Sequence, residues 1–234
     1  MQYAIVTGAT QGMGKAIAEK LLTEGFAVAV CARSQSKLTA LAYDWSTRFP
    51  NSTFLTECCD LSIKEEVDAF AAKVLAAFPV IDLLVNNAGM YLPGELCDEP
   101  DGMLEKMIGV NLYSAYYLSR KVVPGMKSRN SGHIFNMCSV ASLRAYPHGG
   151  AYSIAKYALL GFSENLREEL RTWAIKVTAV CPGATFTPSW EGADIPDGRI
   201  METGDIVSMI WAAYNLSPAA NVDTIILRPV KGDL

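Results

Sequence analysis

The sequence predicts a three-layer α/β/α domain of the Rossmann type, built on a doubly wound, mostly parallel sheet of seven strands. Short apolar runs alternate with helix-patterned segments along all 234 residues. Most of these runs are continuously apolar, which is typical of strands that helices cover on both faces. No linker, repeat or low-complexity stretch interrupts the alternation, so residues 1–234 are expected to form a single domain.

The first half of the chain is expected to contain four strands and three helices. The strands are the apolar runs 3–6, 26–31, 53–58 and 81–85. Apolar residues at helical spacing after the first strand predict a helix that Gly25 ends, and a second helix is expected at 34–49. A third helix should run from Ser62 to about Phe78, because Ser62 and Glu65 have the spacing of a capping box.

The second half should add three helices and three strands. The helices are expected at 101–127, 150–173 and 204–216, and the strands at 133–137, 176–180 and 224–227. Ligands of doubly wound sheets bind beyond the carboxyl ends of the strands. The polar and glycine-rich residues of this chain gather at those ends, at 8–14, Arg33, Asp60, 86–89, 138–139 and 182–183.

Charge and composition exclude several classes of partner. The net charge is −4 and no run of lysine or arginine occurs, so no nucleic acid partner is expected. No apolar segment is long enough to span a membrane, and the first residues, MQYAIVTGAT, lack the features of a signal peptide. The six cysteines form no C-x-x-C pair and only two histidines are present, so no metal site is expected. Unpaired thiols without a leader predict a cytoplasmic protein.

A glycine-rich turn between the first strand and the first helix predicts a dinucleotide site. The turn contains Gly8, Thr10, Gln11, Gly12, Met13 and Gly14. Glycines let the backbone approach a pyrophosphate closely, and the helix that follows offers free N–H groups. The spacing is G-x-x-x-G-x-G rather than the common G-x-G-x-x-G. A glycine turn without a ligand is the alternative.

The residues after the second and third strands indicate which dinucleotide binds. Many dinucleotide sites place an acid after the second strand for the ribose 2′-hydroxyl, but this chain has Ala32, Arg33 and Ser34 there. An arginine can hold a 2′-phosphate, which favours NADP(H) over NAD(H); a solvated surface arginine is the alternative. Asp60, followed by Leu61, could bond the adenine amino group or equally cap the next helix.

Tyr152 and Lys156 lie four residues apart, and therefore one turn apart on the same face of a predicted helix. A nearby ammonium group favours the phenolate and lowers the pKa of a tyrosine from its usual value of about 10. A phenol with a pKa nearer neutrality can act as a general acid or base. The same spacing also occurs in ordinary surface turns, which is the alternative interpretation.

Four motifs in this order give the chain a resemblance to the short-chain dehydrogenase/reductase superfamily, in its single-domain branch. They are TGATQGMG at 7–14, NNAG at 86–89, Ser139 thirteen positions before the tyrosine of the YSIAK stretch, and PG at 182–183. The resemblance extends from about residue 3 to about residue 230. It implies reversible hydride transfer between a nicotinamide cofactor and a carbonyl compound or secondary alcohol.

The resemblance implies four catalytic residues, Asn111, Ser139, Tyr152 and Lys156. Tyr152 would exchange a proton with the substrate oxygen, while Lys156 would lower its pKa and hold the nicotinamide ribose. Ser139 would orient the substrate carbonyl, and Asn111 would position a water molecule that links Lys156 to solvent. Hydroxyl groups suit these roles, because negative charge develops on the substrate oxygen during hydride transfer.

The resemblance also places further residues beside the cofactor. Asn87, Ala88 and Gly89 would line the adenine-ribose side, whereas Pro182, Gly183, Thr185 and Thr187 would lie by the nicotinamide, with Thr187 near its carboxamide. Thr185 departs from the family, which more often has an aliphatic residue there, but its backbone N–H would still serve.

The substrate should contact the loops over the catalytic residues, at 90–96, 140–148 and 186–201. Arg144 and His148 could touch an anionic or polar substrate, with solvated loop residues as the alternative. Trp190 could stack on a flat ring or pack the last loop down. The tail at 225–234 and the TFTPSW stretch locally resemble bacterial sepiapterin-reductase-like proteins, which would imply a pterin or a similar diketone. A 3-oxoacyl-carrier-protein reductase and a non-catalytic NADP(H) sensor are further alternatives.

The two longest predicted helices carry apolar residues on more than one face, among them Tyr113, Tyr116, Leu159 and Phe162. The family resemblance implies that such helices pair between subunits. We therefore expect a homodimer or a homotetramer.

Overall fold

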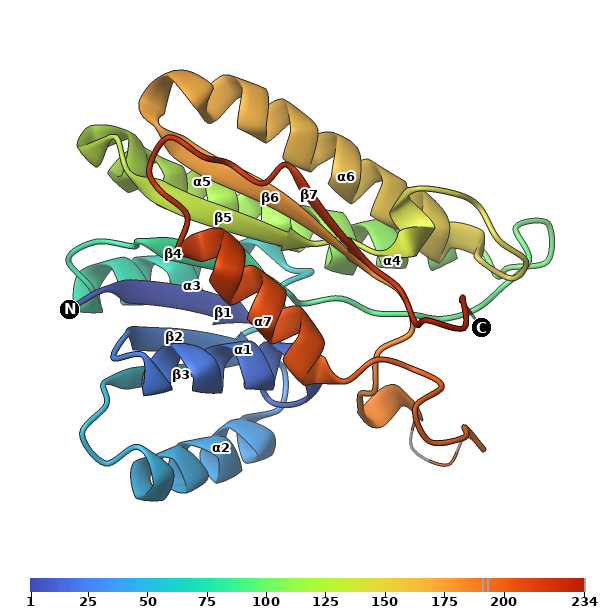
Figure 1. Cartoon of the computed structure of the whole chain (residues 1–234), viewed down its shortest axis with the longest axis horizontal. Helices are drawn as coiled ribbons and strands as arrows, with labels where there is room; N and C mark the ends of the chain where they lie inside the picture. Colours follow the sequence, from blue (N-terminus) through green and yellow to red (C-terminus); the bar gives the residue numbers. More distant parts are fainter. Residues whose placement is uncertain (191, 193, 234) are drawn as a thin grey trace.

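The computed structural model describes residues 1–190, 192 and 194–233, and these form a seven-stranded sheet flanked by helices (Figure 1). The strands are β1 (Tyr3–Thr7), β2 (Ala27–Ala32), β3 (Phe54–Cys58), β4 (Leu83–Asn86), β5 (Gly132–Met137), β6 (Ile175–Pro182) and β7 (Thr224–Leu227). Their order is β3-β2-β1-β4-β5-β6-β7, and every neighbouring pair is parallel. The predicted Rossmann-type sheet is confirmed.

Helices cover both faces of the sheet (Figure 1). They are α1 (Gly12–Thr23), α2 (Gln35–Arg48), α3 (Lys64–Ala77), α4 (Met103–Ile108), α5 (Ser114–Arg129), α6 (Gly150–Leu170) and α7 (Thr203–Tyr214), with a π-helical turn η1 (Gly109–Tyr113) and short 3-10 turns η2 (Val140–Ser142), η3 (Arg171–Trp173) and η4 (Pro188–Trp190). Helices α1, α2 and α7 pack on one face, and α3, α5 and α6 on the other. None of the described helices combines the length and apolar character needed to span a membrane.

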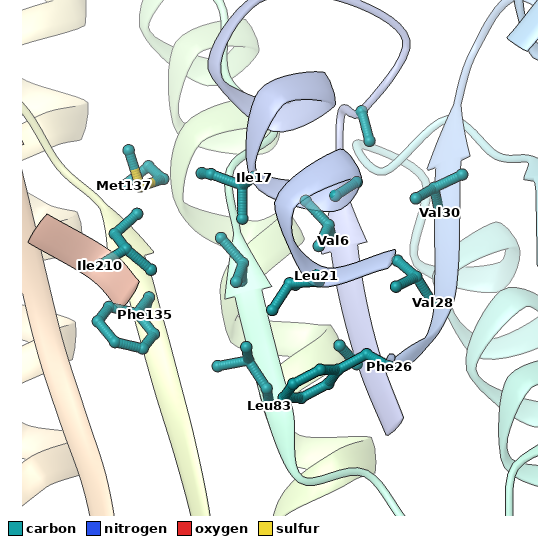
Figure 2. Close-up of a cluster of buried hydrophobic side chains, with 14 of the residues drawn as sticks. Val6, Ile17, Leu21, Phe26, Val28, Val30, Leu83, Phe135, Met137 and Ile210 are labelled. Carbon is teal, nitrogen blue, oxygen red and sulfur yellow. The ribbon is translucent and has the colours of Figure 1, made fainter. Parts of the chain in front are cut away.

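Alternate residues of the central strands enter two separate cores. In β1, Ala4 and Val6 belong to the core under α1 and α7, whereas Ile5 belongs to the core under α3 and α5. Figure 2 shows the first of these cores, in which Ile17 from α1 and Ile210 from α7 lie over the strands. Because both faces are buried, the central strands are almost continuously apolar, which explains the pattern in the sequence.

The start of α3 differs from the prediction. Its N-cap is Ile63, and Ser62 does not cap the helix. Instead, the backbone N–H and the hydroxyl of Ser62 both donate to the carboxylate of Asp60, at 2.9 and 2.7 Å. The predicted capping box with Glu65 is therefore wrong, because the Ser62 side chain is hydrogen-bonded to Asp60 instead. The carboxylate of Glu66 accepts from the Asp60 N–H at 2.7 Å.

The long helix predicted at 101–127 is also different, because it is interrupted. Helix α4 begins at Met103, and η1 joins it to α5, which ends at Arg129. A π turn inserts one extra residue into a helix and is frequently found at functional sites. Here the turn contains Asn111, one of the predicted catalytic residues.

Side chains at the ends of β1 and β4 join these two strands where the strand order reverses. The Thr7 hydroxyl accepts from the backbone N–H groups of Asn87 and Ala88, each at 2.9 Å. The Asn87 amide donates to the carbonyls of Thr7 and Gly8, at 2.8 and 3.2 Å. The two carboxyl ends are thus fixed against each other at the position where doubly wound sheets bind their ligands.

The buried imidazole of His133 in β5 should make stability depend on pH. It stacks on Phe135 with ring centroids 4.0 Å apart, and its Nε2 lies 2.8 Å from the Thr178 hydroxyl. Burial lowers its pKa to about 3, with a smaller contribution from the charge of Lys176. A histidine in the unfolded chain has a pKa of about 6.5, so below that pH the unfolded state takes up a proton that the folded state does not.

The free energy of unfolding should therefore decrease as the pH falls from about 6.5 toward 3, by up to about 1.4 kcal/mol for each pH unit. Urea unfolding between about pH 7 and 5 checks this slope. His133→Gln should remove this pH dependence of the free energy of unfolding. His148→Gln, which replaces the exposed histidine, should leave the pH dependence unchanged. Equal slopes in all three proteins would contradict the prediction.

Candidate active site

A cavity of about 610 Å³ opens at the carboxyl ends of β1 to β4, over the reversal of the strand order. It brings together most of the residues predicted to bind the cofactor: Gly8, Thr10, Gln11, Gly12, Met13, Gly14, Arg33, Ser34, Asp60, Leu61, Asn87, Ala88, Gly89 and Thr187. These residues come from five separate segments of the chain. Their convergence at the switch point of a doubly wound sheet is the arrangement expected for a nucleotide site.

The glycine turn after β1 is packed so closely that it excludes side chains. Gly8 has φ +65°, and a Cβ there would lie 2.9 Å from the Cα of Ala88. A Cβ on Gly14 would collide with the amide nitrogen of Asn87 and with the carbonyl of Gly8. No described side chain caps the first turn of α1, so its backbone N–H groups are available to an anion such as a pyrophosphate.

Two basic residues line the α2 side of the cavity. Arg33 follows β2, and Lys37 lies in the first turn of α2, where its Nζ donates to Oε1 of Gln11 at 2.8 Å. Ser34 is the N-cap of α2, and its hydroxyl accepts from the Lys37 N–H at 3.3 Å. Sequence reasoning missed Lys37. The capping serine places Lys37 in the first turn of the helix that follows Arg33, and this position could have identified it.

Asp60 lies on the same wall. Burial opposes its ionisation, but hydrogen bonds from Ser62 and the positive charge of Arg33 outweigh that effect and lower its pKa. Its carboxylate organises the turn before α3 without being the N-cap of that helix. Contact with an adenine remains a prediction.

Ser139 and Tyr152 meet at the carboxyl end of β5. Ser139 is the N-cap of η2, where its hydroxyl accepts from the Ala141 N–H at 3.1 Å. Tyr152 lies in the first turn of α6, and the Ser139 side chain is close enough to favour ionisation of the Tyr152 phenol. Two hydroxyl groups held side by side can both donate to one ligand oxygen.

The pKa of Tyr152 is shifted in the direction opposite to the prediction. Burial raises it to about 12, although the hydrogen bond from Ser139 opposes this effect. Lys156 does not offset the burial: its Nζ lies 5.8 Å from the centroid of the Tyr152 ring and donates to the carbonyl of Met137 at 2.8 Å. Burial also lowers the pKa of Lys156 to about 8. Both shifts have one cause, because removal from water disfavours the charged form of each group.

Asn111 holds the loop after β4 against the buried lysine. Its Nδ2 donates to the carbonyls of Met90 and Met107, at 3.0 and 3.1 Å, and its Oδ1 accepts from the Met90 N–H at 3.2 Å. A Cβ on Gly89 would lie 2.9 Å from that Oδ1 and 3.4 Å from Nζ of Lys156. Because both amide protons are used, Oδ1 is the atom of Asn111 that can still accept from a water molecule.

Three residues predicted to lie by the nicotinamide are not on the wall of this cavity. Pro182 and Gly183 end β6, where the Gly183 N–H donates to the carbonyl of Leu227 at 2.8 Å. The Thr185 hydroxyl donates to the carbonyl of Gly183 at 3.0 Å. Thr187 does line the cavity, close to Gly12. The roles of the other three therefore stay predictions.

Arg144 and His148, the candidates for substrate contact, both have acidic partners. Nη2 of Arg144 lies 3.2 Å from Oδ2 of Asp233, and Nδ1 of His148 lies 2.8 Å from Oε1 of Glu95. These pairs give each residue a role in fixing its loop. Within the described part of the chain, no cluster of three or more His, Cys, Asp or Glu side chains could hold a metal ion.

Sequence reasoning missed two tyrosines close to Tyr152. The ring centroid of Tyr91 lies 4.9 Å from that of Tyr152, and the side chain of Tyr91 also interacts with Tyr146. They belong to the loops at 90–96 and 140–148, which the sequence identified only as segments. No local pattern distinguishes these tyrosines from other loop residues.

Comparisons with known proteins agree with this geometry. A family model described as short chain dehydrogenase matches residues 2–195. An uncharacterized oxidoreductase of Staphylococcus saprophyticus is 31% identical over 229 residues, which cover 98% of this chain and 97% of that protein. The structure of an alcohol dehydrogenase from the archaeon Thermococcus sibiricus, complexed with 5-hydroxy-NADP, gives a TM-score of 0.90 at 26% identity and covers 100% of this chain and 99% of that one. A metagenomic short-chain oxidoreductase in complex with NADP gives 0.84 at 32% identity, over 98% and 97% of the two chains. The chain therefore belongs to the short-chain dehydrogenase family of oxidoreductases.

Proposed function

We propose that this chain catalyses reversible hydride transfer between NADP(H) and a carbonyl compound or secondary alcohol, with Tyr152 as the acid and base. The proposal depends on one observation above all: the side chains of Ser139 and Tyr152 interact, and the buried amine of Lys156 lies beside the same ring. This group adjoins the glycine-lined cavity, because Gly89 on the cavity wall lies against Lys156. A sensor without catalysis would not need such a pair of hydroxyl groups.

The residues of the cavity fit a dinucleotide. The glycines at 8 and 14 let this turn pack directly against the turn at 87–89, and the first turn of α1 offers N–H groups to the pyrophosphate. The turn at 87–89 would line the adenine-ribose side, and Thr187 would lie near the carboxamide. When bound, the nicotinamide would supply the hydride to a carbonyl carbon or accept it from an alcohol.

The protein's own residues would then control the proton. With a pKa of about 12, Tyr152 keeps its proton at neutral pH and can donate it to an oxygen that gains negative charge. Ser139 would donate a second hydrogen bond to that oxygen and orient it. In the oxidation direction Tyr152 must first lose its proton, which requires a positive charge nearby. Lys156, which is protonated below about pH 8, would supply that charge.

Arg33 and Lys37 support a preference for NADP(H). Both basic side chains lie on the α2 side of the cavity, where a dinucleotide would carry its adenosine ribose. A 2′-phosphate would lie close to these two cations. A free 2′-hydroxyl would have no acid to bond to, because position 32 is an alanine. The similar structures from Thermococcus sibiricus and the metagenome contain 5-hydroxy-NADP and NADP, which agrees with this preference.

We also propose a homodimer or homotetramer in the cytoplasm. Tyr116 of α5 and Ile154 and Tyr157 of α6 are exposed, so pairing of these helices would cover apolar surface. Each of the six cysteines is a free thiol, which is typical of proteins in a reducing compartment.

Tyr152→Phe removes the transferable proton but keeps the ring. Reduction of a panel of aldehydes, ketones and diketones with NADPH should fall by about 100- to 10,000-fold, the range for a lost general acid. The Kd for NADPH, measured by fluorescence titration, should change by less than about twofold. Tyr43→Phe, at an exposed tyrosine of α2, is the control and should keep full turnover. Unchanged turnover in Tyr152→Phe would exclude Tyr152 as the proton donor. If the wild-type protein binds NADPH tightly but reduces no carbonyl compound, the non-catalytic sensor is favoured instead.

Arg33→Asp should change the choice of cofactor. The loss of charged hydrogen bonds to a 2′-phosphate should raise the Kd for NADPH by about 10- to 100-fold and leave the Kd for NADH unchanged or lower. Arg171→Asp is the control, because this exposed arginine lies in η3, away from the cavity. If Arg33→Asp leaves the ratio of the two constants as it is in the wild type, Arg33 does not hold a 2′-phosphate.

The pKa of Lys156 predicts how the reaction depends on pH. Since kcat/KM for NADPH reports ionisations of the ligand-free enzyme, it should be constant below about pH 8 and fall by about tenfold for each pH unit above it, as Lys156 loses its charge. Lys156→Met should show low activity without this decline. A wild-type profile that stays flat to about pH 9.5 would contradict the assignment.

A further inference from the structure

The ring of Tyr91 lies against the ring of the proposed proton donor. The ring centroids of Tyr91 and Tyr152 are 4.9 Å apart and the ring planes are inclined by 76°, an edge-to-face arrangement. Tyr91 is nevertheless 50% exposed, so much of its ring is free of protein contacts. Because the two rings are in contact, a ligand that binds the Tyr152 hydroxyl lies within reach of that exposed ring.

Tyr146 holds Tyr91 in place. The two side chains interact, and burial raises the pKa of Tyr146. This contact connects the loops at 90–96 and 140–148, and the backbone bond from the Gly94 N–H to the His148 carbonyl, at 3.1 Å, connects the same two loops. A ring fixed in this way contacts a ligand without the entropy loss of ordering a mobile side chain.

The loops around the Tyr91 ring contain apolar side chains and basic side chains that are paired with acids. Leu92, next in the same loop, is also exposed. The two basic residues of these loops both have acidic partners, since Arg144 pairs with Asp233 and His148 with Glu95. The described residues of 90–96 and 140–148 therefore offer no unpaired cation to a substrate, while they do offer a fixed aromatic surface.

We propose that Tyr91 determines specificity, by favouring uncharged substrates whose carbonyl carbon is attached to a planar aromatic or conjugated ring. This inference rests on the proposed function and narrows its substrate class. A planar ring beside Tyr91 gains the interaction of an aromatic pair, which a saturated ring of similar size does not. A substrate that carries a carboxylate would lose its hydration without finding a partner in either loop.

Acetophenone and cyclohexyl methyl ketone are a matched pair of probes, because they differ mainly in the planarity and π electrons of one ring. The ratio of their kcat/KM values with NADPH should fall by about 2- to 12-fold in Tyr91→Leu relative to wild type, mainly through KM for acetophenone. Comparison with wild type cancels the intrinsic difference in reactivity. Tyr91→Phe, which keeps the ring but loses the hydroxyl, should retain most of the ratio. Tyr43→Leu, at an exposed tyrosine of α2, is the control.

An unchanged ratio in Tyr91→Leu would overturn the inference, and so would an equal loss for both ketones, since that would indicate a merely structural residue. If the wild type reduces no carbonyl compound at all, the proposed function fails instead. The ratio of the dissociation constants of the two ketones, measured by ligand-observed NMR on the NADP⁺ complexes, tests Tyr91 without turnover. It should shift in the same direction in Tyr91→Leu, and an equal ratio in both proteins would overturn the inference.

Discussion

Four hydrogen bonds between the ends of β1 and β4 support the whole site. They connect Thr7 and Gly8 to Asn87 and Ala88, and so lock the glycine turn against the turn that follows β4. The same lock leaves no space for a side chain on Gly8 or Gly14. It also sets the position of Gly89, which contacts the amide of Asn111 and the amine of Lys156. The same four hydrogen bonds therefore fix the position of the cavity relative to the side chains proposed to transfer the proton.

Burial governs the chemistry of the two titratable groups beside that cavity. Tyr152 and Lys156 are both shifted toward their neutral forms, which is the expected response to a water-poor environment. The protein therefore holds a protonated phenol at neutral pH, together with an amine close to its own pKa. Such a site favours delivery of a proton over its removal, and it makes the amine the group that responds to pH in the physiological range.

The sequence predicted the fold well because burial on two faces leaves a strong signal, and β1 and β2 begin and end within one residue of their predicted bounds. It failed where a local competition decided the outcome, as at Ser62, which bonds to Asp60 instead of capping α3. Most of the residues that line the cavity were predicted from motifs. The pKa of Tyr152 could not be predicted, because its direction depends on how deeply the fold encloses the ring. Tyr91 could not be predicted either, because the path of a long loop is set by tertiary contacts.

The π turn of η1 has a consequence for how this segment can evolve. One extra residue rotates the following helix by about 100° relative to a regular α-helix. That offset lets Met107 of α4 pack on α6 while Leu118 and Val122 of α5 face the sheet. Deletion of a single residue from η1 would restore regular phase and turn one of the two apolar stripes toward solvent. Insertions and deletions should therefore be rare between α4 and α5.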